Sequence, residues 1–193
     1  HIELSFYTNI TNMQDKWLDQ LAKFEKVIVN CSLEGMGDMN DYMRPPSKWA
    51  SVWKNFDKLV QFADTKPGKR IKVRVTTVNQ LTNALHIVPF WKFMHDYQMT
   101  SNRGIGMSTN QLVEPAYYSM AHAPEWLKEQ QREQILEFLK SVGNSLSKSP
   151  RTTTDSEDTW LLKCHPSLKE LKKTSEIMSP EELPWVCKWR ISF

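Results

Sequence analysis

A serine, a glutamate and an arginine follow a short apolar run in this chain. Residues 27–31 read Val-Ile-Val-Asn-Cys, and Ser32, Glu34 and Arg44 come soon after them, with Gly35 in between. A serine hydroxyl can donate to a carboxylate or ribose oxygen, and a glutamate can accept from ribose hydroxyls. An arginine can neutralise a carboxylate through two parallel hydrogen bonds. These residue types therefore predict a ligand-binding loop.

Each of these side chains also has a purely structural interpretation. Ser32 can cap a turn, and Glu34 and Asp41 can be solvated loop charges. Arg44 can pair with Asp38 or Asp41, which precede it by only a few residues. The residues alone leave both interpretations open.

The position of the loop favours a binding role. Residues 27–31 are apolar without alternation, which is typical of a strand covered on both faces in a parallel sheet. In parallel α/β folds the loops that leave the carboxyl ends of the strands bind the ligands. Ser32, Glu34 and Gly35 lie at such a strand end.

Strand and helix patterns alternate along the first two thirds of the chain. The predicted strands are residues 2–8, 27–31, 70–78 and, more weakly, 105–113. The predicted helices begin after Asn12, after Ser47, at 79 and at Pro124; Pro89 divides the third into two pieces, and Gly143 ends the last. This order predicts an α/β fold with a parallel sheet of about four strands and flanking helices.

The composition changes after the last of these helices. We expect one domain over 1–143, a flexible linker over 144–159 that is rich in Ser, Thr, Lys and Asp, and a small helical C-terminal tail over 160–193. Ser179, Pro180 and Glu182 form a good helix start within that tail.

Composition and charge exclude some classes of function. The chain has 193 residues, of which 40% are hydrophobic and 24% charged, with a net charge of +3. That charge is too small and too mixed to indicate nucleic-acid binding. No apolar run approaches the length of a membrane span, and the first residues resemble a strand instead of a signal peptide. We expect a cytoplasmic protein.

The cysteines and histidines do not form a pattern typical of a metal site or a catalytic triad. Cys31, Cys164 and Cys187 are far apart, and the adjacent Cys164 and His165 cannot easily reach one ion. His86, His95 and His122 have no partners that would make a triad. The sequence therefore predicts no metal ligand and assigns no catalytic residue.

Several short motifs together resemble the radical S-adenosylmethionine (radical SAM) family, in particular its members with twitch or SPASM regions. The motifs are Ser32-Leu33-Glu34-Gly35, Asn40-Asp41-Tyr42-Met43-Arg44, Thr8-Asn9-Ile10 and Val75-Thr76-Thr77-Val78. Two positions depart from the family pattern, because Glu34 stands where aspartate is usual and Ile10 stands where glycine is usual.

The resemblance covers roughly residues 2–138 and implies a partial (β/α)6 TIM-like barrel, from its third strand onward. It also implies reductive cleavage of S-adenosylmethionine and hydrogen abstraction from a substrate, either a peptide or a small molecule. The implied cofactor-binding residues are Ser32, Glu34, Arg44, Asn9 and Asn30.

The family also binds a [4Fe-4S] cluster through a CxxxCxxC segment, which this chain lacks. We therefore expect an incomplete fragment that is inactive alone. The alternative is a non-catalytic α/β binding or scaffolding module, which would associate with a partner through an open sheet edge.

Overall fold

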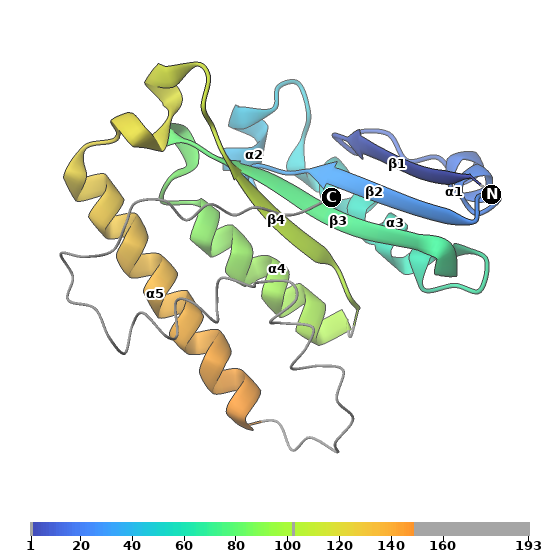
Figure 1. Cartoon of the computed structure of the whole chain (residues 1–193). Coiled ribbons are helices and arrows are strands. Elements are labelled where there is room, and N and C mark those ends of the chain that lie inside the picture. The colour runs from blue at the N-terminus through green and yellow to red at the C-terminus, as the bar shows by residue number, and fades with distance from the viewer. Residues whose placement is uncertain (1, 102, 149–193) are drawn as a thin grey trace. The chain divides into compact units, whose positions relative to one another are not determined.

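Four parallel strands form the sheet that organises the chain (Figure 1). The computed structural model describes residues 2–101 and 103–148, with side chains up to 142, and residues 1–145 form one compact unit. The strands are β1 (Glu3–Thr8), β2 (Lys26–Ser32), β3 (Ile71–Asn79) and β4 (Gly106–Gln111), and they lie side by side in that order. The predicted α/β class and the parallel sheet are confirmed.

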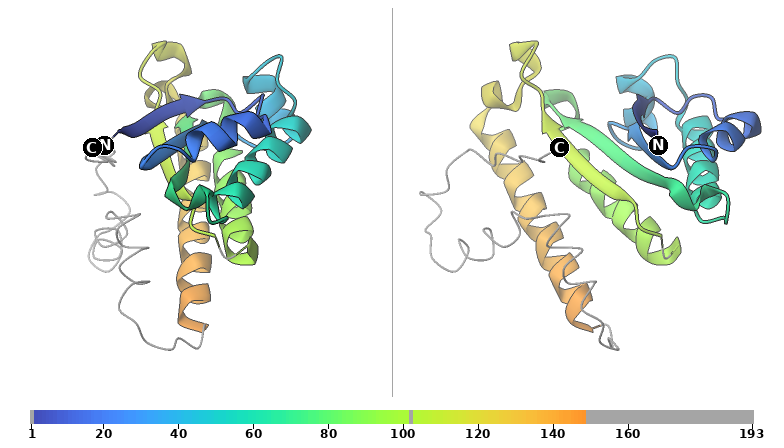
Figure 2. Two further views of the ribbon diagram at one scale, coloured as in Figure 1. Left: turned by 90° about the vertical axis from the view of Figure 1, so that its right-hand side faces the viewer. Right: turned by 45° about the vertical axis from the view of Figure 1, so that its right-hand side comes forward.

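Within the described residues, four α-helices lie between the strands along the chain, and a fifth follows β4. They are α1 (Asp15–Leu21), α2 (Asp38–Met43), α3 (Trp49–Ala63), α4 (Ile87–Ser101) and α5 (Glu125–Lys148). Apolar side chains of α1, α3 and α4 pack against β2 and β3 in one core, and α5 contacts α4 through Phe138 and Trp91, whose ring centroids are 6.4 Å apart. Figure 2 shows these elements from two further sides.

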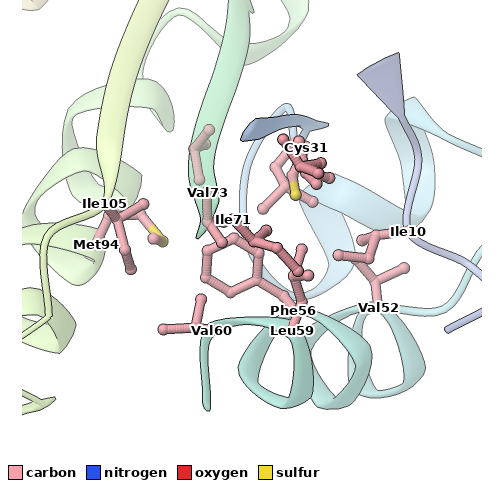
Figure 3. Packing of buried hydrophobic residues seen from close by; sticks show 14 of the residues in the cluster. Ile10, Cys31, Val52, Phe56, Leu59, Val60, Ile71, Val73, Met94 and Ile105 are labelled. Carbon is pink, nitrogen blue, oxygen red and sulfur yellow. The ribbon is translucent and has the colours of Figure 1, made fainter. Parts of the chain in front are cut away.

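Helix α3 shows how the sequence pattern becomes packing. Val52, Phe56, Leu59 and Val60 recur at three- and four-residue spacing and are buried against the sheet. Figure 3 shows Phe56 close to Ile71 and Val73 of β3, and Val52 close to Ile10. The periodicity of the sequence therefore predicts this helix and its buried face correctly.

Within the described part of the chain, helices cover only one face of the sheet. The core contains Val27 and Val29, whereas Lys72 and Arg74 of β3 point to the other face and are exposed. The apolar run of residues 27–31 is typical of a strand covered on both faces, and within residues 2–101 and 103–148 helices cover one of them. The reason is the strand order, because right-handed crossovers between strands that follow one another in a single direction place every helix on the same side.

Some helix ends differ from the prediction. Helix α1 is preceded by Gln14 instead of Asn12, and α3 by Lys48 instead of Ser47. Pro89 lies in the first turn of an unbroken α4, where its missing N–H costs nothing. Helix α5 does not end at Gly143 but continues to Lys148, because a glycine inside a helix costs only about 1 kcal/mol.

The start of the predicted linker, residues 144–148, is therefore helical. The rest of that linker and the predicted tail over 160–193 lie outside the described residues, as do Cys164, His165, Cys187 and the helix start at Ser179.

Cys31 is fully buried in the core, where loss of water contact raises the pKa of its thiol to about 12. With Cys164 and Cys187 changed to serine, we expect Cys31 to resist a disulfide reagent at pH 8 in the folded chain and to react readily in urea. The free energy of unfolding should also fall as the pH rises above about 8.5, where the unfolded thiol ionises first. Rapid labelling of the folded variant would contradict this.

Candidate functional site

A cavity of about 720 Å³ lies at the carboxyl ends of the strands. Each strand contributes a residue from its own exit: Asn9 follows β1, Glu34 follows β2, Gln80 follows β3 and Leu112 follows β4. The segment from Met43 to Lys48 and the start of α3 form the rest of the wall. The cavity therefore lies where ligands bind in parallel α/β folds.

Glu34 and Arg44 form an ion pair in the wall of this cavity. Arg44 Nη2 donates to Glu34 Oε1 at 2.5 Å, and the backbone N–H of Val78 donates to Glu34 Oε2 at 2.7 Å. Glu34 is only 5% exposed, so its carboxylate is held by two elements at once. Arg44 Nε is buried without a partner among the described residues, which leaves one guanidinium donor unmatched.

The sequence left open whether Arg44 pairs with Asp38 or with Asp41, and the structure shows that it pairs with neither. Its partner is Glu34. Asp41 instead accepts from the backbone N–H of Trp49 at 2.5 Å and lies 3.6 Å from Lys48 Nζ. Asp41 thus satisfies one of the unpaired donors at the start of α3, which explains why that helix needs no cap of its own.

The turn after β1 forms in spite of its isoleucine. Ile10 has a φ of 54°, a conformation that favours glycine, and its side chain is fully buried. Thr8 Oγ1 accepts from the Ile10 N–H at 3.0 Å, and Asn55 Nδ2 donates to the Ile10 carbonyl at 2.9 Å. Left-handed backbone costs about 1–2 kcal/mol, and burial of the side chain offsets it.

Asn9 both closes the turn after β1 and lines the cavity. Its Oδ1 accepts from Thr11 Oγ1 at 3.0 Å, which closes the turn, and both residues line the cavity. The structure therefore brings three predicted residues, Asn9, Glu34 and Arg44, to one cavity.

The other two predicted residues, Ser32 and Asn30, do not line that cavity. They lie on the helix-free face of the sheet, since they alternate with the buried Val29 and Cys31. Asn30 Nδ2 donates to the Phe6 carbonyl at 3.2 Å, which ties β2 to β1. Ser32 is half-buried and pairs in register with Thr76.

Some cavity residues escaped the sequence analysis. Lys48 and Gln80 both line the wall, and Met43 accepts hydrogen bonds at its sulfur from Gln80 Nε2 at 3.9 Å and from Thr82 at 3.2 Å. Gln80 had a detectable signal, because it follows a predicted strand as Asn9 does. Lys48 had none, because only the path of the chain through the two prolines before it places it there.

The described residues include no group of three or more His, Cys, Asp or Glu side chains that could hold a metal ion. Cys31, the cysteine within the described ranges, is enclosed by apolar side chains. The residues of this part of the chain therefore do not fit an iron–sulfur cluster. Over the same ranges, no helix combines the length and apolar character needed to cross a membrane.

Fold and cavity define a parallel α/β unit with helices on one face and a polar pocket at the carboxyl edge. No family model and no curated protein matches the chain. It is similar to two solved structures, native anSMEcpe with bound AdoMet (17% identity, 72% of this chain, 35% of that chain, TM-score 0.42) and hexahistidine-tagged anSMEcpe with bound AdoMet (15% identity, 73% and 38%, TM-score 0.46). The chain spans little more than a third of the length of those structures.

Proposed function

We propose that the chain is the C-terminal part of a radical SAM-type enzyme and that the cavity at the carboxyl edge binds S-adenosylmethionine. The chain would supply the third and later strands of a partial (β/α)6 barrel. The observation that carries the proposal is Arg44, which an ion pair with Glu34 holds in the cavity wall while 29% of its side chain stays exposed.

The cavity residues suit the parts of this cofactor. Arg44 would bind its carboxylate, since a guanidinium and a carboxylate match in geometry and charge. Asn9, Thr11 and Gln80 offer amide and hydroxyl groups to ribose, and Leu112 offers an apolar surface to the adenine. Ser32 lies on the helix-free face, outside this cavity, and has no part in this proposal. Glu34 would act mainly by orienting Arg44, because both of its oxygens already accept hydrogen bonds.

When bound to a reduced cluster, S-adenosylmethionine supplies a carbon-centred radical that abstracts hydrogen from a substrate. The described residues do not fit that cluster, so the role proposed for them is to bind and orient the cofactor. The chain by itself is expected to bind S-adenosylmethionine without cleaving it.

Calorimetric titration of the full chain with S-adenosylmethionine tests the proposal. We expect saturable binding that Arg44→Gln weakens at least tenfold, since a hydrogen bond to a charged group contributes about 1.5–3 kcal/mol. Lys54→Gln, on an exposed part of α3, removes the same charge outside the cavity and is expected to bind normally. Circular dichroism establishes that both variants fold.

No binding to the folded chain, or equal binding by the Arg44→Gln variant, would reject the proposal. The alternative is then a non-catalytic binding or scaffolding module. The edge strands β1 and β4 favour that role, because each has a strand neighbour on one side only among the described residues. Sedimentation analysis would detect association through such an edge.

A further inference from the structure

Most side chains on the helix-free face of the sheet are polar, with Ile28 as an apolar exception beside Lys72. Two rows of residues cross it in strand register. The first row is Tyr7, Asn30, Arg74 and Gly106, and the second, nearer the carboxyl ends, is Ser32, Thr76 and Ser108. A purely parallel sheet is normally covered on both faces, so a polar face that no helix covers within residues 2–101 and 103–148 is unusual.

Two positive charges on this face lack a negative partner. Lys72 and Arg74 are exposed, and neither makes an ion pair or a side-chain hydrogen bond within residues 2–101 and 103–142. Lys26, at the amino end of the same face, differs because it pairs with Glu3 at 2.5 Å. The middle of the face therefore has an excess of positive charge.

Gly106 shapes the place where the Arg74 side chain lies. A Cβ at Gly106 would come within 2.9 Å of Arg74 Cγ, 3.6 Å of Cδ and 3.7 Å of Nε. The stem of Arg74 therefore lies over β4 at the one position of that row that has no side chain. This contact keeps the guanidinium close to the sheet.

Hydroxyl groups lie two residues further along the strands from Arg74, on the same face. Thr76 Oγ1 and Ser108 Oγ are 3.2 Å apart, and Ser32 is the register partner of Thr76 on the other side. A hydroxyl can donate one hydrogen bond to an anion, and its rotor is free to turn toward it. Ammonium, guanidinium and hydroxyl groups thus follow one another along β3 on this face, at Lys72, Arg74 and Thr76.

We propose that this face binds the phosphate group of a small-molecule ligand. A phosphate dianion matches the two unpaired charges, with Arg74 binding through paired N–H groups and Lys72 acting as a point charge. The hydroxyl row would donate to the remaining oxygens. The site goes beyond the proposed S-adenosylmethionine cavity, because Arg74 does not line that cavity.

Nuclear magnetic resonance of the ¹⁵N-labelled full chain tests this, with inorganic phosphate as the probe at constant ionic strength. We expect saturable shifts of the Arg74 Nε–H and of the Thr76 and Ser108 amides. Arg74→Gln should weaken phosphate binding at least tenfold. Gly106→Val should also weaken it, because the new side chain displaces Arg74 without changing the charge of the protein.

Lys54→Gln is the charge-matched control on the opposite side of the sheet and should keep the wild-type affinity. Shifts that do not saturate, equal weakening by Lys54→Gln, or unchanged affinity in both the Arg74 and Gly106 variants would overturn the inference. Shifts confined to Arg44 and Lys48 would do so as well. Loss of phosphate binding with S-adenosylmethionine binding intact in the Arg74→Gln variant would separate the two sites.

Discussion

Replacing Glu34 by glutamine is expected to lower the free energy of unfolding by about 3 kcal/mol. The carboxylate is almost completely buried and accepts from both Arg44 and the Val78 N–H. Removing one partner of a buried pair leaves the other charge uncompensated, which typically costs about 3–5 kcal/mol. The lower end of that range applies because the Arg44 side chain is 29% exposed and keeps some water.

Urea unfolding of the full chain measures this effect. Glu137→Gln, on an exposed position of α5, makes the same chemical change and should stay within about 0.5 kcal/mol of the wild type. The double variant Glu34→Gln, Arg44→Gln should be less destabilised than the sum of the two single changes, since it leaves no unpaired charge. Equal stability of the Glu34 and Glu137 variants would show that the ion pair contributes little.

Glu34→Asp tests why position 34 has the longer of the two acidic side chains. The shorter side chain has the same charge but cannot keep both of its present contacts without movement of the loop. Asn83 resists such movement, because its buried amide donates to the Glu34 carbonyl at 3.0 Å and to the Val78 carbonyl at 2.9 Å. The glutamate therefore matches the spacing of these two strand ends.

The sequence predicts the strands and helices because their patterns are local. An apolar run such as residues 27–31 and the three- and four-residue spacing of α3 are visible without any knowledge of tertiary structure. The convergence of strand exits then follows from parallel pairing, which places Asn9, Glu34 and Gln80 around one cavity. The position of the site is thus a consequence of topology.

The interaction partners of the site residues depend on tertiary structure, so the sequence alone did not identify them. Asp38, Asp41 and Glu34 are all near Arg44 along the chain, and only the path of the loop selects Glu34. The backbone of Ile10 is a similar case. A branched residue argues against a left-handed turn. Ile10 is stabilised there because its N–H donates to Thr8, its carbonyl accepts from Asn55, and its side chain is buried.

Phe56→Ala is expected to have the largest effect on stability, about 3–5 kcal/mol, because it removes a fully buried aromatic ring and leaves a cavity. The ring stacks on Trp53 at 5.4 Å and lies 6.2 Å from Tyr97 of α4, so it joins two helices to the sheet. Phe62→Ala, on the same helix but only partly buried, should cost clearly less. Urea unfolding compares the two variants.

The same variant also tests how the core supports the site. Helix α3 carries Val52 in the cavity wall and Asn55 beneath the Ile10 turn, so a looser α3 removes support from both. We therefore expect Phe56→Ala to weaken ligand binding at the cavity even at temperatures where the chain remains folded. Unchanged binding by a destabilised Phe56→Ala variant would mean that β2, β3 and the Glu34–Arg44 pair hold the cavity without help from α3.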